Sequence, residues 1–199
     1  LITGTTVDIR QVAAYSNVIG NDVLEEVMDK NLDHFIPIGY TEEELAYAGK
    51  FKEVVTELDK EGLKDMIAHV VEKDKRKEVL DMPLLDFKLD RSESYGGGGS
   101  TDVGDVSWCI PTAQINTSTF PAQAPGHSWQ NVSCGRTSIA HKNMLLAGKV
   151  IAATAIDLME KPDVLQAAKD EFNKKMKRYG GYTCPVPQGA VPVIPGEKM

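Results

Sequence analysis

Residues 137–161 read TSIAHKNMLLAGKVIAATAIDLMEK and include the most apolar window of the chain. This composition predicts one long helix, with Thr137 or Ser138 as its N-cap. The apolar window contains Lys149 and Asp157 and is shorter than the span of a membrane. The stretch is therefore expected to be a buried helix of a globular domain, and no membrane span is expected.

The rest of the sequence indicates more helices on either side of this one. Pro162 suits the first turn of a last helix over 162–179, and Asn21 is a good N-cap for a helix that begins at Asp22. Thr41 and Glu44 have the spacing of a capping box. The helix that they open is expected to end at Gly62, and a further helix with near-ideal apolar spacing follows from Leu63.

Strands are fewer. Residues 5–17 are rich in β-branched residues and predict a strand, and residues 107–118 predict a buried one that Pro111 makes irregular. Residues 83–99 and 120–136 are expected to be loops. The sequence thus predicts a mixed α/β chain, rich in helix, whose thin sheet needs strands from elsewhere.

Composition excludes several classes of function. The chain has 199 residues, 42% of them hydrophobic, and a net charge of −7. An acidic chain is a poor nucleic-acid binder, and its basic runs at 72–78 and 173–179 have the mixed charge of solvated helix faces. Because no secretory signal is visible at the start, we expect a cytoplasmic protein.

The three cysteines are widely spaced, which argues against a disulfide framework and against a zinc finger. A redox function of Cys109 and Cys134 has only their positions, one in the expected strand and one in a loop, in its favour. Neither has a neighbouring base that would lower its pKa.

The run GGGGSTDVGDVSW at 96–108 is the first candidate site. It is not a phosphate-binding loop, because Asp105 stands where such a loop needs a lysine. Asp102 and Asp105 are suited to bind a cation or to orient a metal-binding histidine, and equally to cap turns. His127, in PGHSW, is either an exposed loop histidine or a ligand of zinc, cobalt or manganese.

The motifs GSTDVGDVSW, PGHSWQ, SIAHKNMLLAGKVIAATAIDLMEKPDVLQAAKDEF and a late YTCPVP together resemble the aminoacylase and carboxypeptidase-G-like family of two-metal amidohydrolases. The resemblance is specific over 99–185 and weaker over 1–45. It implies the C-terminal part of a hydrolase-like three-layer α/β/α catalytic domain over 21–199, with a helical elaboration at 41–80 and a site loop at 96–106. Residues 1–20 would end the lid, or dimerisation, domain.

The same resemblance implies the chemistry. Two divalent ions (zinc, manganese or cobalt) would activate water to hydrolyse N-acyl or aminobenzoyl amino acids, or dipeptide-like substrates, with a glutamate as general base. His127 falls on the last metal ligand. Ser100 and Asp102 of the Gly-Ser-x-Asp motif, with Asp105, would shape the site behind it, and Arg10 and Asn21 lie where they would meet the substrate carboxylate.

The family's other metal ligands and its general base have no counterpart in this sequence, which begins without an initiator methionine. We therefore expect a fragment that lacks the N-terminal part of its enzyme, is inactive alone, and associates through unpaired strand edges. The parent enzyme is expected to be a homo-oligomer. The alternative is a non-catalytic structural or binding protein that retains this half of the fold.

Overall fold

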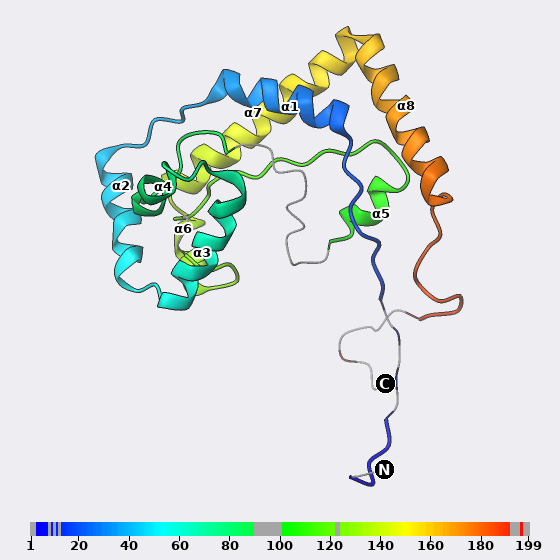
Figure 1. Ribbon diagram of the computed structural model, residues 1–199, viewed down its shortest axis with the longest axis horizontal. Helices are drawn as coiled ribbons and strands as arrows, with labels where there is room; N and C mark the ends of the chain where they lie inside the picture. Colours follow the sequence, from blue (N-terminus) through cyan, green and yellow to red (C-terminus); the bar gives the residue numbers. More distant parts are fainter. Residues whose placement is uncertain are drawn as a thin grey trace.

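The computed structural model describes residues 3–7, 9, 11, 13–89, 101–121, 124–191 and 196. Regular structure in this part of the chain is helical, without a β-strand (Figure 1). The elements are α1 (Asp22–Phe35), α2 (Glu42–Gly49), the 3-10 helix η1 (Lys50–Glu53), α3 (Glu57–Val70), α4 (Arg76–Asp81), α5 (Val103–Ser107), α6 (Trp129–Cys134), α7 (Ser138–Glu160) and α8 (Pro162–Tyr179).

Helix α7 forms the centre of the fold, with α1 packed along it and α8 turned back beside both (Figure 1). Asn31 of α1 donates its side-chain amide to Asp157 of α7 at 2.8 Å. Glu171 of α8 accepts the backbone N–H groups of Asp22 and Val23 at 2.8 and 3.0 Å. This carboxylate satisfies donors at the positive end of α1, which stabilises the start of that helix.

The local helix signals are confirmed. Asn21 caps α1 through its side-chain oxygen, Thr41 and Glu44 form the predicted capping box of α2, and Thr137 caps α7. Pro162 occupies the first turn of α8. Each signal lies within four residues of the helix start that it sets, so its geometry depends little on the rest of the fold.

The expected helix end at Gly62 is wrong. Helix α2 ends at Gly49 and is followed by η1, and Gly62 lies inside α3. Thr56 and Asp59 form a second capping box that starts α3. A glycine costs a helix about 1 kcal/mol relative to alanine, which a well-capped helix tolerates.

Neither expected strand forms in the described residues. Ser107 ends α5, and residues 111–118 have no regular structure. The described residues of 5–17 have none either. A strand needs a neighbour to pair with, and the described part of the chain folds none beside either segment. The helix-rich character is confirmed, while the three-layer fold and the lid strand stay predictions. The expected loop at 120–136 is also partly helical, since it contains α6.

A second group of helices lies at the N-terminal end of α7 (Figure 1). The buried core of α3, α4 and the turn between them consists of Leu63, Ile67, Val71 and Val79. A separate core joins α2 to α7 through Ala48, Leu84 and Ile139. The predicted elaboration over 41–80 is thus built from α2, η1, α3 and α4; whether it is a distinct unit stays a prediction.

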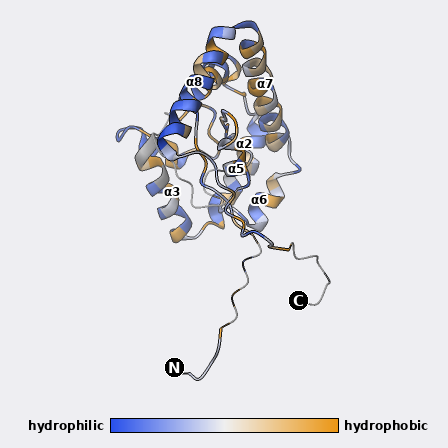
Figure 2. Cartoon of the chain, turned by 90° about the vertical axis from the view of Figure 1, so that its right-hand side faces the viewer, coloured by the Kyte–Doolittle hydropathy of each residue, from blue (hydrophilic) through white to orange (hydrophobic). Residues whose placement is uncertain are grey.

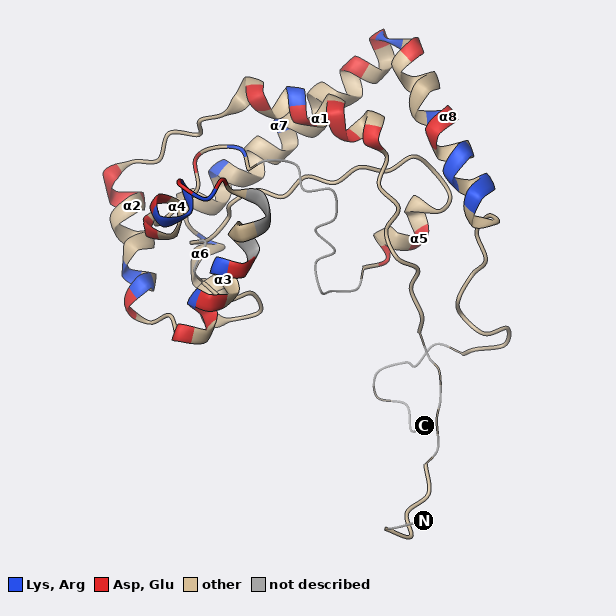
Figure 3. Ribbon diagram, viewed as in Figure 1, with Lys and Arg blue, Asp and Glu red and all other residues tan. Residues whose placement is uncertain are grey.

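Helix α7 is buried along one face only, which qualifies the expectation of a buried helix. Leu146, Val150 and Thr154 are buried, whereas Met144, Ile151 and Met159 are 62%, 53% and 75% exposed. Figure 2 shows hydrophobic residues along this helix. Acidic and basic side chains are interspersed on most helices, with a basic end to α8 (Figure 3). In the described residues, no helix is long and apolar enough to cross a membrane.

Candidate functional site

The two aspartates of the glycine-rich motif lie at α5, Asp102 at the N-cap position directly before the helix and Asp105 within it. Asp102 is exposed and makes no capping hydrogen bond to α5. Asp105 accepts hydrogen bonds from the Ser16 hydroxyl at 2.8 Å and the Tyr182 hydroxyl at 3.0 Å. The bond from Ser16 contributes most to a lowered pKa of the Asp105 carboxyl. Asp105 therefore ties α5 to the segment before α1 and to the C-terminal tail.

The remainder of this motif holds the segment that leads into α1. The backbone N–H of Ile19 donates to the Ser107 hydroxyl at 2.8 Å, and that hydroxyl donates to the Gly104 carbonyl at 2.5 Å. The Trp108 indole N–H donates to the Asn17 carbonyl at 2.9 Å. Sequence reasoning missed this docking function, because a hydrogen bond between residues 88 or 91 positions apart leaves no local signal.

Asn21 is buried, with 2% of its surface exposed. Its side-chain oxygen accepts the Leu24 N–H at 3.1 Å, and its amide donates to the Ala168 carbonyl at 2.9 Å. The side chain thus joins the start of α1 to α8. The structure gives it this structural contact, and the predicted contact with a substrate carboxylate stays a prediction.

His127 lies in a turn directly before α6 and is exposed. Its φ of 55° is in the left-handed region, which few residues other than glycine adopt. The Ser128 hydroxyl caps α6 by accepting the Asn131 N–H at 3.3 Å and donates to the Pro125 carbonyl at 2.5 Å. A backbone in a sparsely populated region, fixed by the cap of the following helix, is the kind of geometry found at ligand sites.

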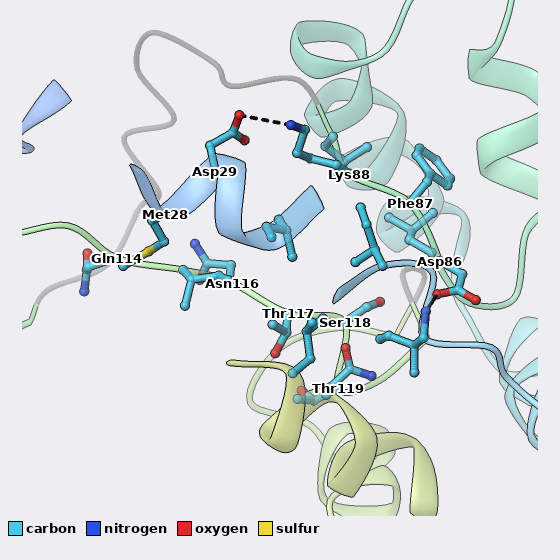
Figure 4. Close-up of a pocket in the computed structure, with 18 of the residues that line it drawn as sticks. Met28, Asp29, Asp86, Phe87, Lys88, Gln114, Asn116, Thr117, Ser118 and Thr119 are labelled. Atoms are coloured by element: carbon cyan, nitrogen blue, oxygen red, sulfur yellow. Dashed lines mark hydrogen bonds and ion pairs between the residues drawn. The ribbon is translucent and has the colours of Figure 1, made fainter. Parts of the chain in front are cut away.

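A cavity of about 620 Å³ lies beside this turn, lined by Gly126. Its walls come from α1, residues 85–89, residues 114–120 and α7. Figure 4 shows polar side chains of residues 116–119 along one side and Asp29 and Lys88 on the other. Lys88 bridges Asp29 and Asp33 at 3.0 and 2.7 Å. Lys88 is therefore already paired with carboxylates, and the lining keeps an excess of acidic over basic side chains, since Glu25 and Asp86 also line the cavity.

The predicted site residues do not meet in this chain. Helix α5 carries Asp105, and helix α6 follows His127. These two helices lie at opposite sides of the molecule (Figure 1). The residues that the structure describes contain no group of three or more histidine, cysteine, aspartate or glutamate side chains able to hold a metal ion. Arg10 and Ser100 lie outside the described residues.

Comparison with known proteins finds relatives of the chain. It is 37% identical, over 96% of its length, to one of the subunits of p-aminobenzoyl-glutamate hydrolase from Escherichia coli (strain K12). Over 47% of its length it is 27% identical to human Xaa-Arg dipeptidase and, again over 47%, 29% identical to the mouse protein. The chain thus resembles the aminoacylase and carboxypeptidase-G-like amidohydrolase family over this portion of such enzymes. The resemblance of the quoted motifs to this family is thereby confirmed.

The chain covers only part of the length of these relatives. It spans 40% of the E. coli protein and 21% of either dipeptidase, which confirms that the resemblance is to a portion of such enzymes. No protein-family profile matches it, and no solved structure does.

The described residues of the chain do not by themselves fit a two-ion centre. One imidazole, that of His127, stands in a suitable loop, and a catalytic zinc site of the kind found in hydrolases needs three protein ligands. The complete centre, its ions and its general base are therefore subjects of the proposal below.

The redox interpretation loses support in the structure. Cys134 is buried, and burial raises the pKa of its thiol, which disfavours the reactive thiolate. Cys109 is exposed and follows α5, on the other side of the molecule (Figure 1). All three cysteines are free thiols.

Proposed function

We propose that this chain is part of a metal-dependent amidohydrolase that cleaves the amide bond of N-acyl or aminobenzoyl amino acids. The observation that carries the proposal is the 37% identity over nearly the whole chain to a hydrolase of p-aminobenzoyl-glutamate. The more distant relatives are named as dipeptidases, which also split an amide bond next to an amino acid. The shared chemistry is attack of water on that amide.

In this proposal His127 supplies one ligand to a two-ion centre of zinc, manganese or cobalt. The ions, when bound, supply an activated water and polarise the amide carbonyl. The left-handed turn before α6 holds the histidine outside any helix, so that it can face a partner surface. The other ligands and the general-base glutamate would come from polypeptide outside this chain, and we expect the chain alone to be inactive.

The other assignments are less direct. Asp102 and Ser100 are proposed to shape the centre from behind, and Arg10 and Asn21 to contact the substrate carboxylate. Asp105 already binds Ser16 and Tyr182, so any effect that it has on the site passes through the position of α5. If the chain is instead a non-catalytic binding protein, neither metal binding nor hydrolysis is expected, whether the chain is isolated or joined to the rest of an enzyme.

A chimera tests the proposal. This chain replaces the matched 40% of the E. coli relative, and hydrolysis of p-aminobenzoyl-glutamate is measured together with metal content by elemental mass spectrometry. His127→Ala should abolish hydrolysis and lower the metal content, whereas His141→Ala, an exposed histidine of α7, should leave both unchanged. Full metal content and activity in the His127→Ala chimera would remove this residue from the centre. Hydrolysis by the isolated chain would contradict its expected inactivity.

A further inference from the structure

Trp129 is an exposed aromatic side chain two residues after the candidate metal ligand His127. It is the first residue of α6, and 62% of its surface is exposed. The buried residues of this helix are Gln130 and Cys134, so the helix turns Trp129 away from the core. Tryptophan is highly buried on average, and an exposed one is a frequent anchor for a bound molecule.

Three aromatic rings form a row that ends at Trp129. Tyr47 of α2 meets Phe51 of η1 edge-on, with ring centroids 5.4 Å apart. Phe51, which is 6% exposed, contacts Trp129 in turn, with centroids 6.0 Å apart and ring planes inclined by 37°. The Tyr47 hydroxyl also donates to the Ser133 carbonyl of α6 at 3.4 Å. The inner rings thus support Trp129 from one side and leave most of its surface accessible.

The backbone fixes Trp129 close to His127. Ser128 lies between them and caps α6, and His127 has the left-handed φ of 55°. Two residues of chain span at most about 7 Å, so the Cα atoms of His127 and Trp129 are no farther apart than that. In an aroyl amide the ring is bonded directly to the carbonyl carbon that is cleaved. An amide held beside His127 therefore has its ring within reach of Trp129.

We propose that Trp129 determines specificity for the acyl group and stacks on the ring of substrates whose acyl group is aromatic. This inference rests on the proposed function, in which His127 holds a metal ion beside the cleaved amide. The substrate ring continues the row of Phe51 and Trp129, in the offset or inclined contact that aromatic pairs prefer. The substrate in the name of the E. coli relative, p-aminobenzoyl-glutamate, carries such a ring on its amide carbonyl.

The helical elaboration over 41–80 takes part in this subsite. Tyr47 and Phe51 both belong to it, the first on α2 and the second on η1. The segment carries no predicted metal ligand, so its contribution is to hold Trp129 in place. Choice of the acyl group and binding of the metal are thereby assigned to different parts of the chain, which meet at the start of α6.

The first experiment compares two substrates in the chimera with the E. coli relative, p-aminobenzoyl-glutamate and N-acetyl-glutamate, which differ only in the acyl group. Trp129→Ala should raise KM for p-aminobenzoyl-glutamate about tenfold, through loss of the ring contact and the area that it buries. Because stacking holds substrate and transition state alike, kcat should change little. The constants for N-acetyl-glutamate should stay the same. Trp129→Phe keeps a ring and should retain most of the parent's affinity.

The second experiment measures binding without hydrolysis. Calorimetric titration of p-aminobenzoyl-glutamate into the chelator-treated chimera gives a dissociation constant, which Trp129→Ala should raise by a similar factor. Met159→Ala is the control, because Met159 is 75% exposed and lies at the other end of α7. It should bind as the parent does. Both side chains are exposed, so both variants should keep the parent's circular dichroism and melting temperature.

Three results would overturn this assignment. An equal loss with both substrates in Trp129→Ala means that the indole supports the site as a whole. A clearly lower melting temperature of that variant means that polypeptide outside this chain covers the indole. Unchanged KM and binding mean that the substrate ring does not touch it. A parent chimera that hydrolyses neither substrate contradicts the proposed function instead, and the titration then still decides whether Trp129 binds the ring.

Discussion

Gly104 of α5 lies against the backbone of Ser16, so closely that a β-carbon at position 104 would overlap the Ser16 carbonyl oxygen. This contact, together with the Ser107 and Trp108 hydrogen bonds, holds the segment before α1 onto α5. The glycine of the Gly-Asp-Val-Ser-Trp motif is thus required for close packing of two segments distant in sequence. A motif that resembles an active-site loop also has this structural function.

Gly104→Ala should therefore destabilise the chain. The added methyl group meets backbone and not a movable side chain, and overpacking of this kind costs about 1–3 kcal/mol. Urea unfolding followed by circular dichroism measures the change. Gly148→Ala is the matched control, because a β-carbon there meets no atom within 4 Å and alanine is the better helix former. Equal stability of the two variants would show that α5 does not pack against Ser16.

Glu44 should make the chain sensitive to acid. Burial raises the pKa of its carboxyl, but hydrogen bonds from Lys142, Ser138 and the Thr41 N–H outweigh this effect and lower the pKa to about 2. Unfolded glutamate titrates near 4.3. The stabilisation is therefore complete above pH ~4.5 and is lost as the pH falls toward 2.

Glu44→Gln should cost about 1.5–3 kcal/mol at pH 7, the range for hydrogen bonds to a charged group, and progressively less below pH ~4. Unfolding free energies at several pH values measure this difference. Glu43→Gln, at an exposed neighbouring residue, is the control and should change the unfolding free energy little at neutral or at acidic pH. A Glu44→Gln cost that does not depend on pH would mean that the carboxylate charge is not stabilising.

Asn21→Ala should lower the stability of the folded chain, whether or not Asn21 contacts a substrate. The change removes the N-cap of α1 and the hydrogen bond from the Asn21 amide to the Ala168 carbonyl of α8, together a loss of about 1–3 kcal/mol. Thermal melts of Asn21→Ala and of the exposed control Asn17→Ala make the comparison. An unchanged melting temperature with impaired hydrolysis in the chimera would instead support the predicted contact with the substrate.

The three thiols should differ in reactivity. Cys109 and Cys184 are exposed, whereas Cys134 is buried and the pKa of its thiol is raised by that burial. A colorimetric thiol reagent at pH 8 should therefore label two cysteines quickly in the folded chain and the third only in urea. Cys134→Ser should remove the slow phase. Fast labelling of all three would reopen the redox interpretation.

Some of this molecule is determined by short stretches of its sequence. The starts of α1, α2, α7 and α8 follow from Asn21, Thr41 with Glu44, Thr137 and Pro162, because a cap acts on backbone groups within one turn. The resemblance to the family could also be recognised from the sequence, since the motifs that carry it are contiguous. His127 was singled out in the same way, through the loop that carries it, and its assignment as a metal ligand stays a prediction.

Only the tertiary structure decided what these segments contact. Local pattern placed a strand over 107–118, but strand formation depends on a neighbour that the described part of the chain does not fold there. Nothing near Asp105 in the sequence indicates Ser16 or Tyr182, and nothing near Asn143 indicates a cavity. Caps are local interactions, whereas strand pairing, close packing and buried acceptors are relations between segments that the fold alone brings together.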